Sequence, residues 1–207
     1  MIRIISGMYK GKRLKRVPSP LVRPMPDKLK EALFNILRET VRGRAFLDAF
    51  AGTGSVGIEA LSRGADKTVF IEEYPRAVRI IKENLAKVGA EGRALVVARE
   101  YNRAVIDLAR DGFLFDFVFL DPPYKLLEER DPLKVLRKRG VVRPGGTVIL
   151  RHHFKTKPPL KDFPLIRSVR LGDDTLSFFS PVKPLSYSPI ERPNNSGDTS
   201  LNYSRDT

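Results

Sequence analysis

The stretch "FLDAFAGTGSVGIEAL", from Phe46 to Leu61, joins a short apolar segment to a helical pattern through a glycine-rich turn. Gly52, Gly54 and Gly57 fit the spacing G-x-G-x-x-G, in which glycine lets the backbone turn tightly and approach a ligand closely. Glu72 ends the next apolar segment, where a carboxylate is placed to hold a ribose diol. The stretch therefore predicts a strand, a loop and a helix that bind a nucleoside-containing cofactor. A tight strand-to-helix turn without a ligand is the alternative.

Around this unit, short apolar runs alternate with helical patterns. The runs are "AFLDAFA", "KTVFIE", "RALVVA", "FDFVFLD" and "GTVILRH", and helical spacing covers residues 55–63, 75–88, 102–110 and 132–139. Short apolar strands separated by helices are typical of a parallel sheet covered on both faces. Two further strands, "LIRSVRL" and "TLSFFSPV", are separated only by "GDD" and must form a hairpin, so one strand should run antiparallel to the rest. We expect an α/β, Rossmann-like fold.

The regions on either side of this alternating part have a different character. Residues 1–44 are predicted to form a basic N-terminal extension: a short hairpin or arm, a break at "PSPLVRPMP", and a helix over 27–40 with Asp27 placed to cap its start. The alternating domain covers residues 45–183. Residues 184–207 are rich in Ser, Asn, Pro and Asp without apolar periodicity, and we interpret them as a flexible polar tail.

Composition narrows the possible functions. The formal charge is +14, and residues 1–45 hold 12 Lys or Arg against 3 acids, a net +9, which favours a polyanionic partner over a merely solvated surface. The chain has no cysteine and only two histidines, so a disulfide framework is excluded and zinc chemistry is not expected. No apolar run approaches the length of a membrane span, and we expect a cytoplasmic protein.

The residues around the glycine turn favour one cofactor. A dinucleotide would place its pyrophosphate at the helix N-terminus, whereas S-adenosylmethionine has no phosphate and carries an ammonium and a sulfonium. Asp48 supplies a negative charge for the ammonium side, although it could instead cap backbone N–H groups of the turn. In "VVAREYN", Glu100 and Tyr101 are placed to border the adenine, and a surface position for Glu100 is the alternative.

The stretch "DPPY", residues 121–124, ends the fourth strand, which lies next to the first strand in a doubly wound sheet. Asp121 offers a carboxylate, and the Pro122 carbonyl is kept out of the strand ladder because Pro123 has no N–H. Tyr124 offers a ring on which a base can stack. These groups fit methyl transfer to an exocyclic amine of a planar base, which needs acceptors to orient the nitrogen. The alternative is a rigid turn with a capping acid and a packed tyrosine.

The chain resembles a known family, and the resemblance covers about residues 1–183. It is carried by "RIISGMYKGKRL", "RPMPDKLKEALFNIL", "LDAFAGTGSVGIEALSRGA", "FIEEYPRA" and "FLDPPY". These motifs are similar to those of the RsmD-type 16S rRNA guanine-N2 methyltransferases, within the class I S-adenosylmethionine-dependent methyltransferases. The class fold that this implies is a seven-stranded sheet with an antiparallel last strand.

The resemblance also implies residue roles. The cofactor would be held by the glycine loop and the acids near it, namely Asp48, Phe50, Gly52, Gly54, Glu72 and Asp121. Asp121, Pro122 and Tyr124 would handle the guanine, and the extension would bind rRNA through Arg3, Lys10, Lys12, Arg13 and Arg23. No metal is implied. The expected partner of the monomer is 16S rRNA, within a small-subunit particle or an assembly intermediate.

Two other functions stay open from the residues alone. The same turn serves amino-group methylation of adenine or cytosine in DNA, of other rRNA sites, and of a glutamine amide in proteins. The chain could also be a non-catalytic RNA-binding assembly factor that has kept the fold.

Overall fold

The computed structural model describes residues 2–18, 25–123, 126–127, 131–156 and 163–181. The strands are β1 (Ile2–Arg3), β2 (Arg13–Leu14), β3 (Ala45–Ala49), β4 (Lys67–Glu72), β5 (Ala94–Ala98), β6 (Phe115–Leu120), β7 (Val142–His153), β8 (Leu165–Leu171) and β9 (Asp174–Phe179). The helices are α1 (Asp27–Leu37), α2 (Ser55–Ser62), α3 (Pro75–Val88), α4 (Tyr101–Arg110) and α6 (Pro132–Arg139), with 3₁₀ turns η1 (Arg38–Val41) and η2 (Glu91–Arg93). The predicted tail, residues 184–207, lies outside the described residues.

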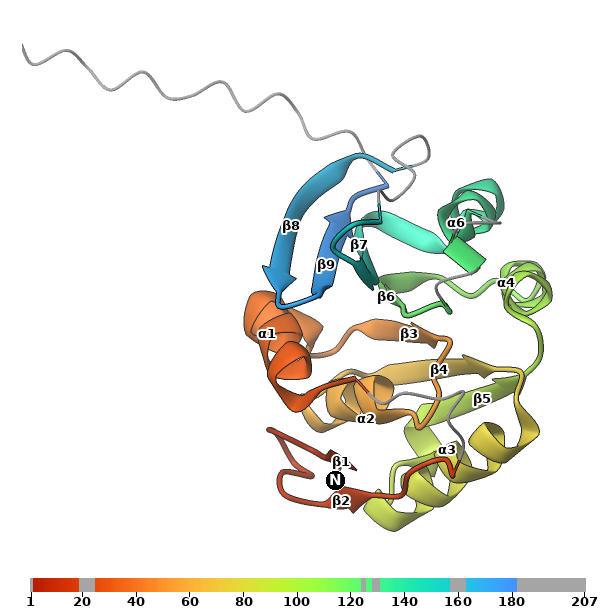
Figure 1. The fold of residues 1–207 in the computed structure, drawn as a ribbon. Coiled ribbons are helices and arrows are strands. Elements are labelled where there is room, and N and C mark those ends of the chain that lie inside the picture. Colours follow the sequence, from red (N-terminus) through yellow and green to blue (C-terminus); the bar gives the residue numbers. More distant parts are fainter. Residues whose placement is uncertain (1, 19–24, 124–125, 128–130, 157–162, 182–207) are drawn as a thin grey trace, which may run out of the picture.

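Seven strands form one twisted sheet in the order β5-β4-β3-β6-β7-β9-β8 (Figure 1). Strands β3 to β7 pair in parallel, while β9 runs antiparallel to both β7 and β8. The predicted sheet with an antiparallel last strand is therefore confirmed. The chain moves outward from β3 to β5 and then crosses back to β6, so the strand order reverses between β3 and β6. Ligands of doubly wound sheets bind outside the strand ends at such a point.

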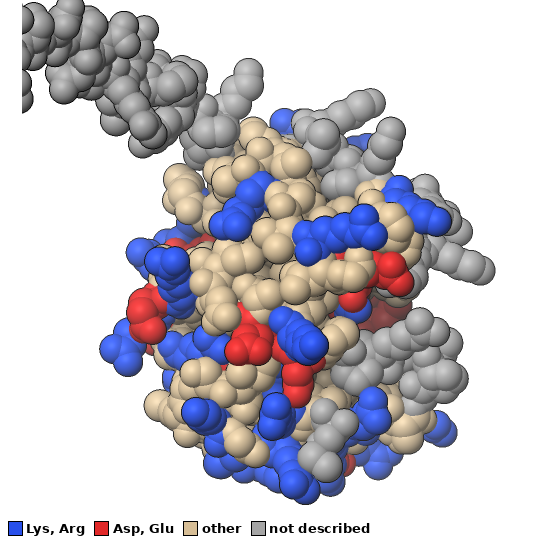
Figure 2. Space-filling model, turned by 60° about the vertical axis from the view of Figure 1, so that its left-hand side comes forward, with Lys and Arg blue, Asp and Glu red and all other residues tan. Residues whose placement is uncertain are grey.

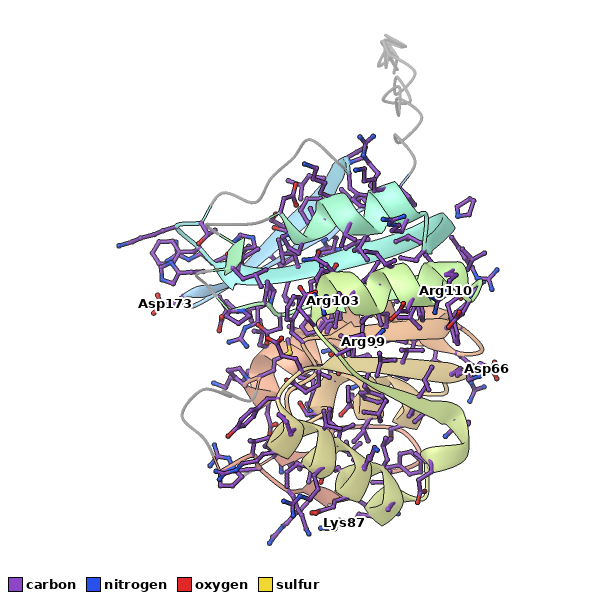
Figure 3. The ribbon with its side chains drawn as sticks, turned by 90° about the vertical axis from the view of Figure 1, so that its right-hand side faces the viewer. Asp66, Lys87, Arg99, Arg103, Arg110 and Asp173 are labelled. Carbon is purple, nitrogen blue, oxygen red and sulfur yellow. The ribbon has the colours of Figure 1, made fainter. Side chains whose placement is uncertain are left out.

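Helices cover both faces of the sheet, as the continuous apolar strands require. One face packs against α4 and α6, which lie in front of the sheet in Figure 3. Side chains of α1 and α2 fill the other face, and α3 covers its β4–β5 end. Alternation along β3 distributes its side chains: Leu47 and Ala49 face the α4 side, and Phe46 faces the α1 side. Asp48 follows Phe46 by two residues, so it lies on the α1 side as well.

The predicted basic hairpin forms as β1 and β2, which pair antiparallel below α2 and to the left of α3 in Figure 1. Its apolar residues, among them Ile4 and Leu14, join a buried cluster with both helices. Gly7 lies against the end of α2, because a Cβ on it would stand 1.9 Å from the carbonyl oxygen of Ser62. The hairpin is therefore a docked part of the domain surface.

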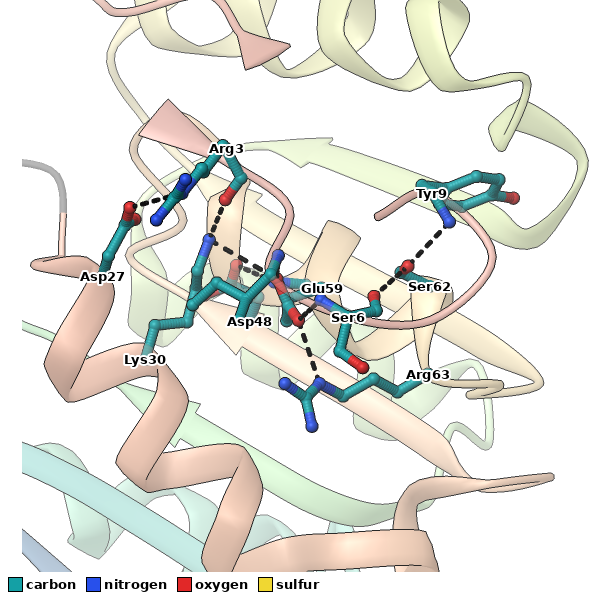
Figure 4. Close-up of polar contacts among 11 residues, drawn as sticks. Arg3, Ser6, Tyr9, Asp27, Lys30, Asp48, Glu59, Ser62 and Arg63 are labelled. Atoms are coloured by element: carbon teal, nitrogen blue, oxygen red, sulfur yellow. Dashed lines mark hydrogen bonds and ion pairs between the residues drawn. The ribbon is translucent and has the colours of Figure 1, made fainter. Parts of the chain in front are cut away.

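A buried carboxylate anchors this hairpin (Figure 4). Glu59 of α2 is fully buried and accepts the backbone N–H groups of Ile5, at 2.8 Å, and Ser6, at 3.0 Å. Arg63 donates to it at 2.9 Å, and Lys30 of α1 pairs with it at 3.5 Å. The carboxylate thus joins the hairpin, α1 and α2 at one point.

The prediction that Asp27 caps its helix is wrong. Pro26 occupies the cap position of α1, and no side chain caps that end. Asp27 is the first helical residue, and its carboxylate instead pairs with Arg3 at 3.3 Å. An acid in the first turn still complements the helix dipole. The segment predicted as one helix over 27–40 also divides, because the last part is the 3₁₀ turn η1.

Within the described ranges, no helix combines the length and apolar character that crossing a membrane requires. In the same residues, no group of three or more His, Cys, Asp or Glu side chains is arranged to hold a metal ion.

Candidate cofactor and amine-acceptor site

The glycine turn joins β3 to α2 as predicted. Gly52 and Gly54 have φ angles of 57° and 74°, and Gly54 is the residue before the first turn of α2. Asp48 is buried, and its carboxylate accepts the N–H of Gly57 at 2.8 Å. This contact is the capping arrangement that we considered for Asp48. It fixes the helix start against the strand from which the turn leaves.

Phe50 has a strained backbone at the tip of this turn. Its φ of 64° is in the left-handed region, which bulky residues rarely adopt. Such strain is typical of positions that hold a ligand or complete a site. The ring lies 4.6 Å from that of Tyr101, centroid to centroid, so the loop after β3 contacts the first residue of α4 through these two aromatic side chains.

Glu72 binds the same turn from the neighbouring strand. Its carboxylate accepts the N–H of Gly52 at 2.7 Å and the N–H of Tyr74 at 2.9 Å. Two backbone hydrogen bonds hold the side chain over the glycine turn, where the sequence predicted it. In this arrangement Glu72 shapes the turn as well as offering negative charge to it.

Asp121 lies one residue beyond the end of β6, at the same edge of the sheet. Leu120 pairs in register with Leu150, which places Asp121 beside Arg151, and the two side chains form an ion pair at 2.8 Å. The Asp121 side chain keeps 26% of its surface exposed. Pro122 is buried and Pro123 is exposed. Tyr124, the predicted stacking ring, lies outside the described residues.

Three carboxylates at or near strand ends lie around the glycine turn, and burial is the largest cause of the pKa shift of each. Burial raises the pKa of Asp48 well above its usual value, and the charges of Asp121 and Glu72 raise it further against the Gly57 hydrogen bond. Burial likewise raises the pKa of Glu72 despite its backbone hydrogen bonds, and that of Asp121 despite Arg151. Neighbouring carboxylates with raised pKa values cost stability and are typical of functional sites.

This arrangement suits a cationic ligand better than a phosphate. An ammonium or a sulfonium placed among three carboxylates would relieve their repulsion, whereas a pyrophosphate would add to it. The N–H of Gly57, which could have served an anion at the start of α2, is already bonded to Asp48. The three carboxylates, together with the already bonded N–H of Gly57, therefore fit S-adenosylmethionine and do not fit the pyrophosphate of a dinucleotide.

The two residues predicted to border the adenine have other contacts. Glu100 is the residue before α4, and its side chain accepts the N–H of Arg103 at 3.0 Å, which makes it a helix cap. Tyr101 is buried, and its hydroxyl donates to the carbonyl of Pro132 at 2.8 Å. Burial raises the pKa of Tyr101, so the hydroxyl stays protonated. Their role at the adenine stays a prediction.

Four of the five residues predicted to bind RNA are described and exposed, and the fifth, Arg23, lies outside the described residues. Arg3, Lys10, Lys12 and Arg13 all face solvent, although Arg3 pairs with Asp27 and Lys12 reaches the Val88 carbonyl at 3.4 Å. Figure 2 shows Lys and Arg side chains gathered over the lower end of the molecule, where the hairpin lies. The hairpin thus buries its apolar residues and presents its cations.

Sequence reasoning missed two residues of this region. The sequence did not identify Arg151 as a site residue, because a cation near the end of an apolar strand usually lies on the surface. Asn84 of α3 is fully buried and accepts the N–H of Lys15 at 2.7 Å, while its amide donates to the Thr53 carbonyl at 3.0 Å. It therefore joins the basic extension to the glycine turn. A lone asparagine within a helical pattern was the available signal.

The fold and the site together define a class. A doubly wound sheet with an antiparallel last strand, a glycine turn after the first strand and strand-end acids on either side of the order reversal are the features of the class I S-adenosylmethionine-dependent methyltransferases. The predicted cofactor, S-adenosylmethionine, follows from membership of this class.

Comparisons with known proteins place the chain within it. The model of a family described as "Conserved hypothetical protein 95" matches residues 2–180. The Ribosomal RNA small subunit methyltransferase D of Haemophilus influenzae is 32% identical over 157 residues, which cover 76% of this chain and 81% of that protein. Its namesake from Escherichia coli K12 is 41% identical over 130 residues, covering 62% and 64% respectively. A solved structure of a hypothetical protein of Thermus thermophilus is 33% identical, with a TM-score of 0.75 over 87% of this chain and 99% of that one. The chain therefore belongs to this family of RsmD-type methyltransferases, as its motifs predict.

Proposed function

We propose that the protein transfers a methyl group from S-adenosylmethionine to the exocyclic N2 amine of a guanine in 16S rRNA of the small ribosomal subunit. From the resemblance of its motifs to the family, we expect the target to be a guanine-966 type site. The observation that carries the proposal is the convergence of Asp48, Glu72 and Asp121 around the glycine turn, at the point where the strand order reverses. The names of the Haemophilus and Escherichia relatives support the small-subunit rRNA as the substrate.

The residues would divide the work as follows. Asp48, Phe50, Gly52, Gly54 and Glu72 would hold the cofactor, which supplies an electrophilic methyl group on a sulfonium. Glu100 and Tyr101 would border its adenine.

The residues at the end of β6 would receive the base. Asp121 and the Pro122 carbonyl would accept the amine hydrogens and direct the nitrogen lone pair toward the methyl group, while Tyr124 would stack on the guanine. The new N–C bond forms as the S–C bond breaks, the bonding electrons stay on sulfur, and the amine then releases one proton.

The basic extension, residues 1–44, would hold flanking RNA through Arg3, Lys10, Lys12, Arg13 and Arg23. The target base must leave its stack to reach Asp121, which favours an exposed loop of a small-subunit particle or an assembly intermediate. We place this reaction in the cytoplasm, with the protein acting as a monomer whose residues 45–183 would form the catalytic domain.

The experiment is to incubate the protein with S-adenosylmethionine carrying a labelled methyl group and either naked 16S rRNA or small subunits that lack the modification. We expect label on a single guanine, located by nuclease mapping. Asp121→Ala should abolish turnover while calorimetry still detects cofactor binding. Label on adenine or cytosine, on DNA or on protein would instead support an amino-group methyltransferase with another acceptor. Absence of cofactor binding would favour a non-catalytic RNA-binding assembly factor.

A further inference from the structure

Arg151 connects the ends of three strands at the candidate site. It lies on β7 with only 12% of its side chain exposed. Its Nη1 donates to Oδ2 of Asp121 at 2.8 Å, and its Nε donates to Oδ1 of Asp174 at 2.9 Å. Asp121 follows β6 and Asp174 begins β9, so the guanidinium joins the acid of the "DPPY" turn to the antiparallel strand.

The register of the sheet fixes this bridge. Leu150 pairs with Leu120, which brings Arg151 level with Asp121, and Arg151 itself pairs with Leu176. Asp174 lies two residues before Leu176 on β9, so it shares the face of Arg151 and meets it on the diagonal. A planar guanidinium with donors in a fixed fork can hold two carboxylates at once, which a lysine ammonium does with less geometric control.

The bridge has a directional effect on Asp121. The guanidinium engages Oδ2, so rotation of the carboxyl group is restricted and Oδ1 is left outside this ion pair. Charged groups around Asp121 come from three strands: Asp48 on β3, Arg151 on β7 and Asp174 on β9. Of these, only Arg151 is positive. Burial and the charge of Asp174 raise the pKa of Asp121, and Arg151 lowers it.

We propose that Arg151, held by Asp174, is a positioning residue that fixes the Asp121 carboxylate as the hydrogen-bond acceptor for the target amine. This inference rests on the proposed function, because it assigns a purpose to the orientation of Asp121. A protonated Asp121 would offer the amine a donor where it needs an acceptor. Arg151 therefore sets both the direction of the carboxylate and the pH above which it is able to act.

The test compares variants by the pH dependence of single-turnover methylation of the small-subunit substrate. In Arg151→Gln, the single-turnover rate constant at neutral pH should fall by roughly one to two orders of magnitude, with the cofactor Kd unchanged, because small misplacements of a catalytic group have effects of that size. The acid limb of the profile should move to higher pH. Arg151→Lys keeps the positive charge and should move the limb less.

Asp174→Asn gives a shift of opposite sign. The asparagine oxygen can still accept from Nε, so Arg151 stays in place, but a negative charge near Asp121 is gone. The acid limb should therefore move to lower pH. A purely structural role for the bridge would not move the two limbs in opposite directions.

Arg143→Gln is the matched control, because Arg143 lies on the same strand and pairs with Asp116 at 3.7 Å. This variant should keep the wild-type profile. An unchanged acid limb in Arg151→Gln would overturn the inference.

A second measurement separates this inference from the proposed function. Carbon NMR of the Asp121 carboxyl group should show a higher pKa in Arg151→Gln than in the wild type, whether or not the protein methylates RNA. If the wild type transfers no methyl group but this shift is present, the proposed function fails, and only the electrostatic effect of Arg151 on the Asp121 carboxyl group is supported. If methylation is present and neither the profile nor the carboxyl pKa moves, the bridge fails alone.

Discussion

Replacing Glu59 with glutamine would test the buried anchor of the hairpin. Glu59 is fully buried, and its two oxygens receive the N–H groups of Ile5 and Ser6 together with the Arg63 guanidinium. Glutamine has one acceptor oxygen and no charge. Its NH2 group must therefore face at least one of these donors, and it cannot accept a hydrogen bond from it. Lys30, with 1% of its side chain exposed, loses its counter-ion.

The size of the effect follows from these contacts. Removing one partner of a buried ion pair costs about 3–5 kcal/mol, because an uncompensated charge stays behind. Lys30 keeps a hydrogen bond to the Arg3 carbonyl at 2.7 Å, and burial already lowers its pKa, so it can release its proton. We therefore expect the lower end, about 3 kcal/mol. In a chain of this size, that loss lowers the unfolding midpoint by roughly 6–12 °C.

Urea unfolding followed by circular dichroism would measure this loss. The deficit should be present at neutral pH and shrink as the pH approaches 10.5, where Lys30 also loses its proton in the unfolded chain. Glu83→Gln is the matched control, because Glu83 makes an exposed ion pair with Lys15 of the same extension and should change little. A loss below about 1 kcal/mol, the range of an exposed pair, would refute the reasoning.

Three further substitutions address the cofactor side. Asp48→Asn should raise the unfolding midpoint of the cofactor-free protein at neutral pH, because the raised pKa of Asp48 means that its charged form costs stability. This gain should vanish below the usual aspartate pKa, and calorimetry should show weaker cofactor binding. Gly57→Ala should lose about 1–3 kcal/mol in urea unfolding, since its Cβ would stand 2.3 Å from the buried ring of Phe70. Asn84→Ala breaks the link from the extension to the Thr53 carbonyl, so limited proteolysis should cut the extension faster while the rest of the domain resists.

Much of the fold could be predicted because its elements are separated by clear signals. The apolar runs and their glycine boundaries locate the sheet strands, and the short "GDD" connection requires the antiparallel pair β8 and β9. The position of Asp121 next to the glycine turn followed from the strand order alone. The strand boundaries follow from local patterns, whereas the position of Asp121 also required the strand order of a doubly wound sheet.

The contacts that escaped prediction depend on residues far apart in the sequence. Asp27 is a good helix cap by type, but Pro26 takes that position and the acid turns to Arg3. Tyr101 follows a strand as a cofactor-contacting residue would, yet its hydroxyl is bonded to Pro132 on another helix. Glu59 gave a signal that could have been used, because a charge inside an otherwise apolar helix needs buried partners.

The way the hairpin is held has an evolutionary consequence. Glu59 accepts the backbone N–H groups of Ile5 and Ser6, and the Ser62 carbonyl accepts the N–H of Met8 at 2.8 Å. The side chains of these three hairpin residues take no part in the bonds. Mutations on the outer surface of the hairpin can therefore accumulate without undoing its attachment. That surface can therefore change one residue at a time, and a protein engineer could exchange its outward-facing side chains while the hairpin stays attached to α2.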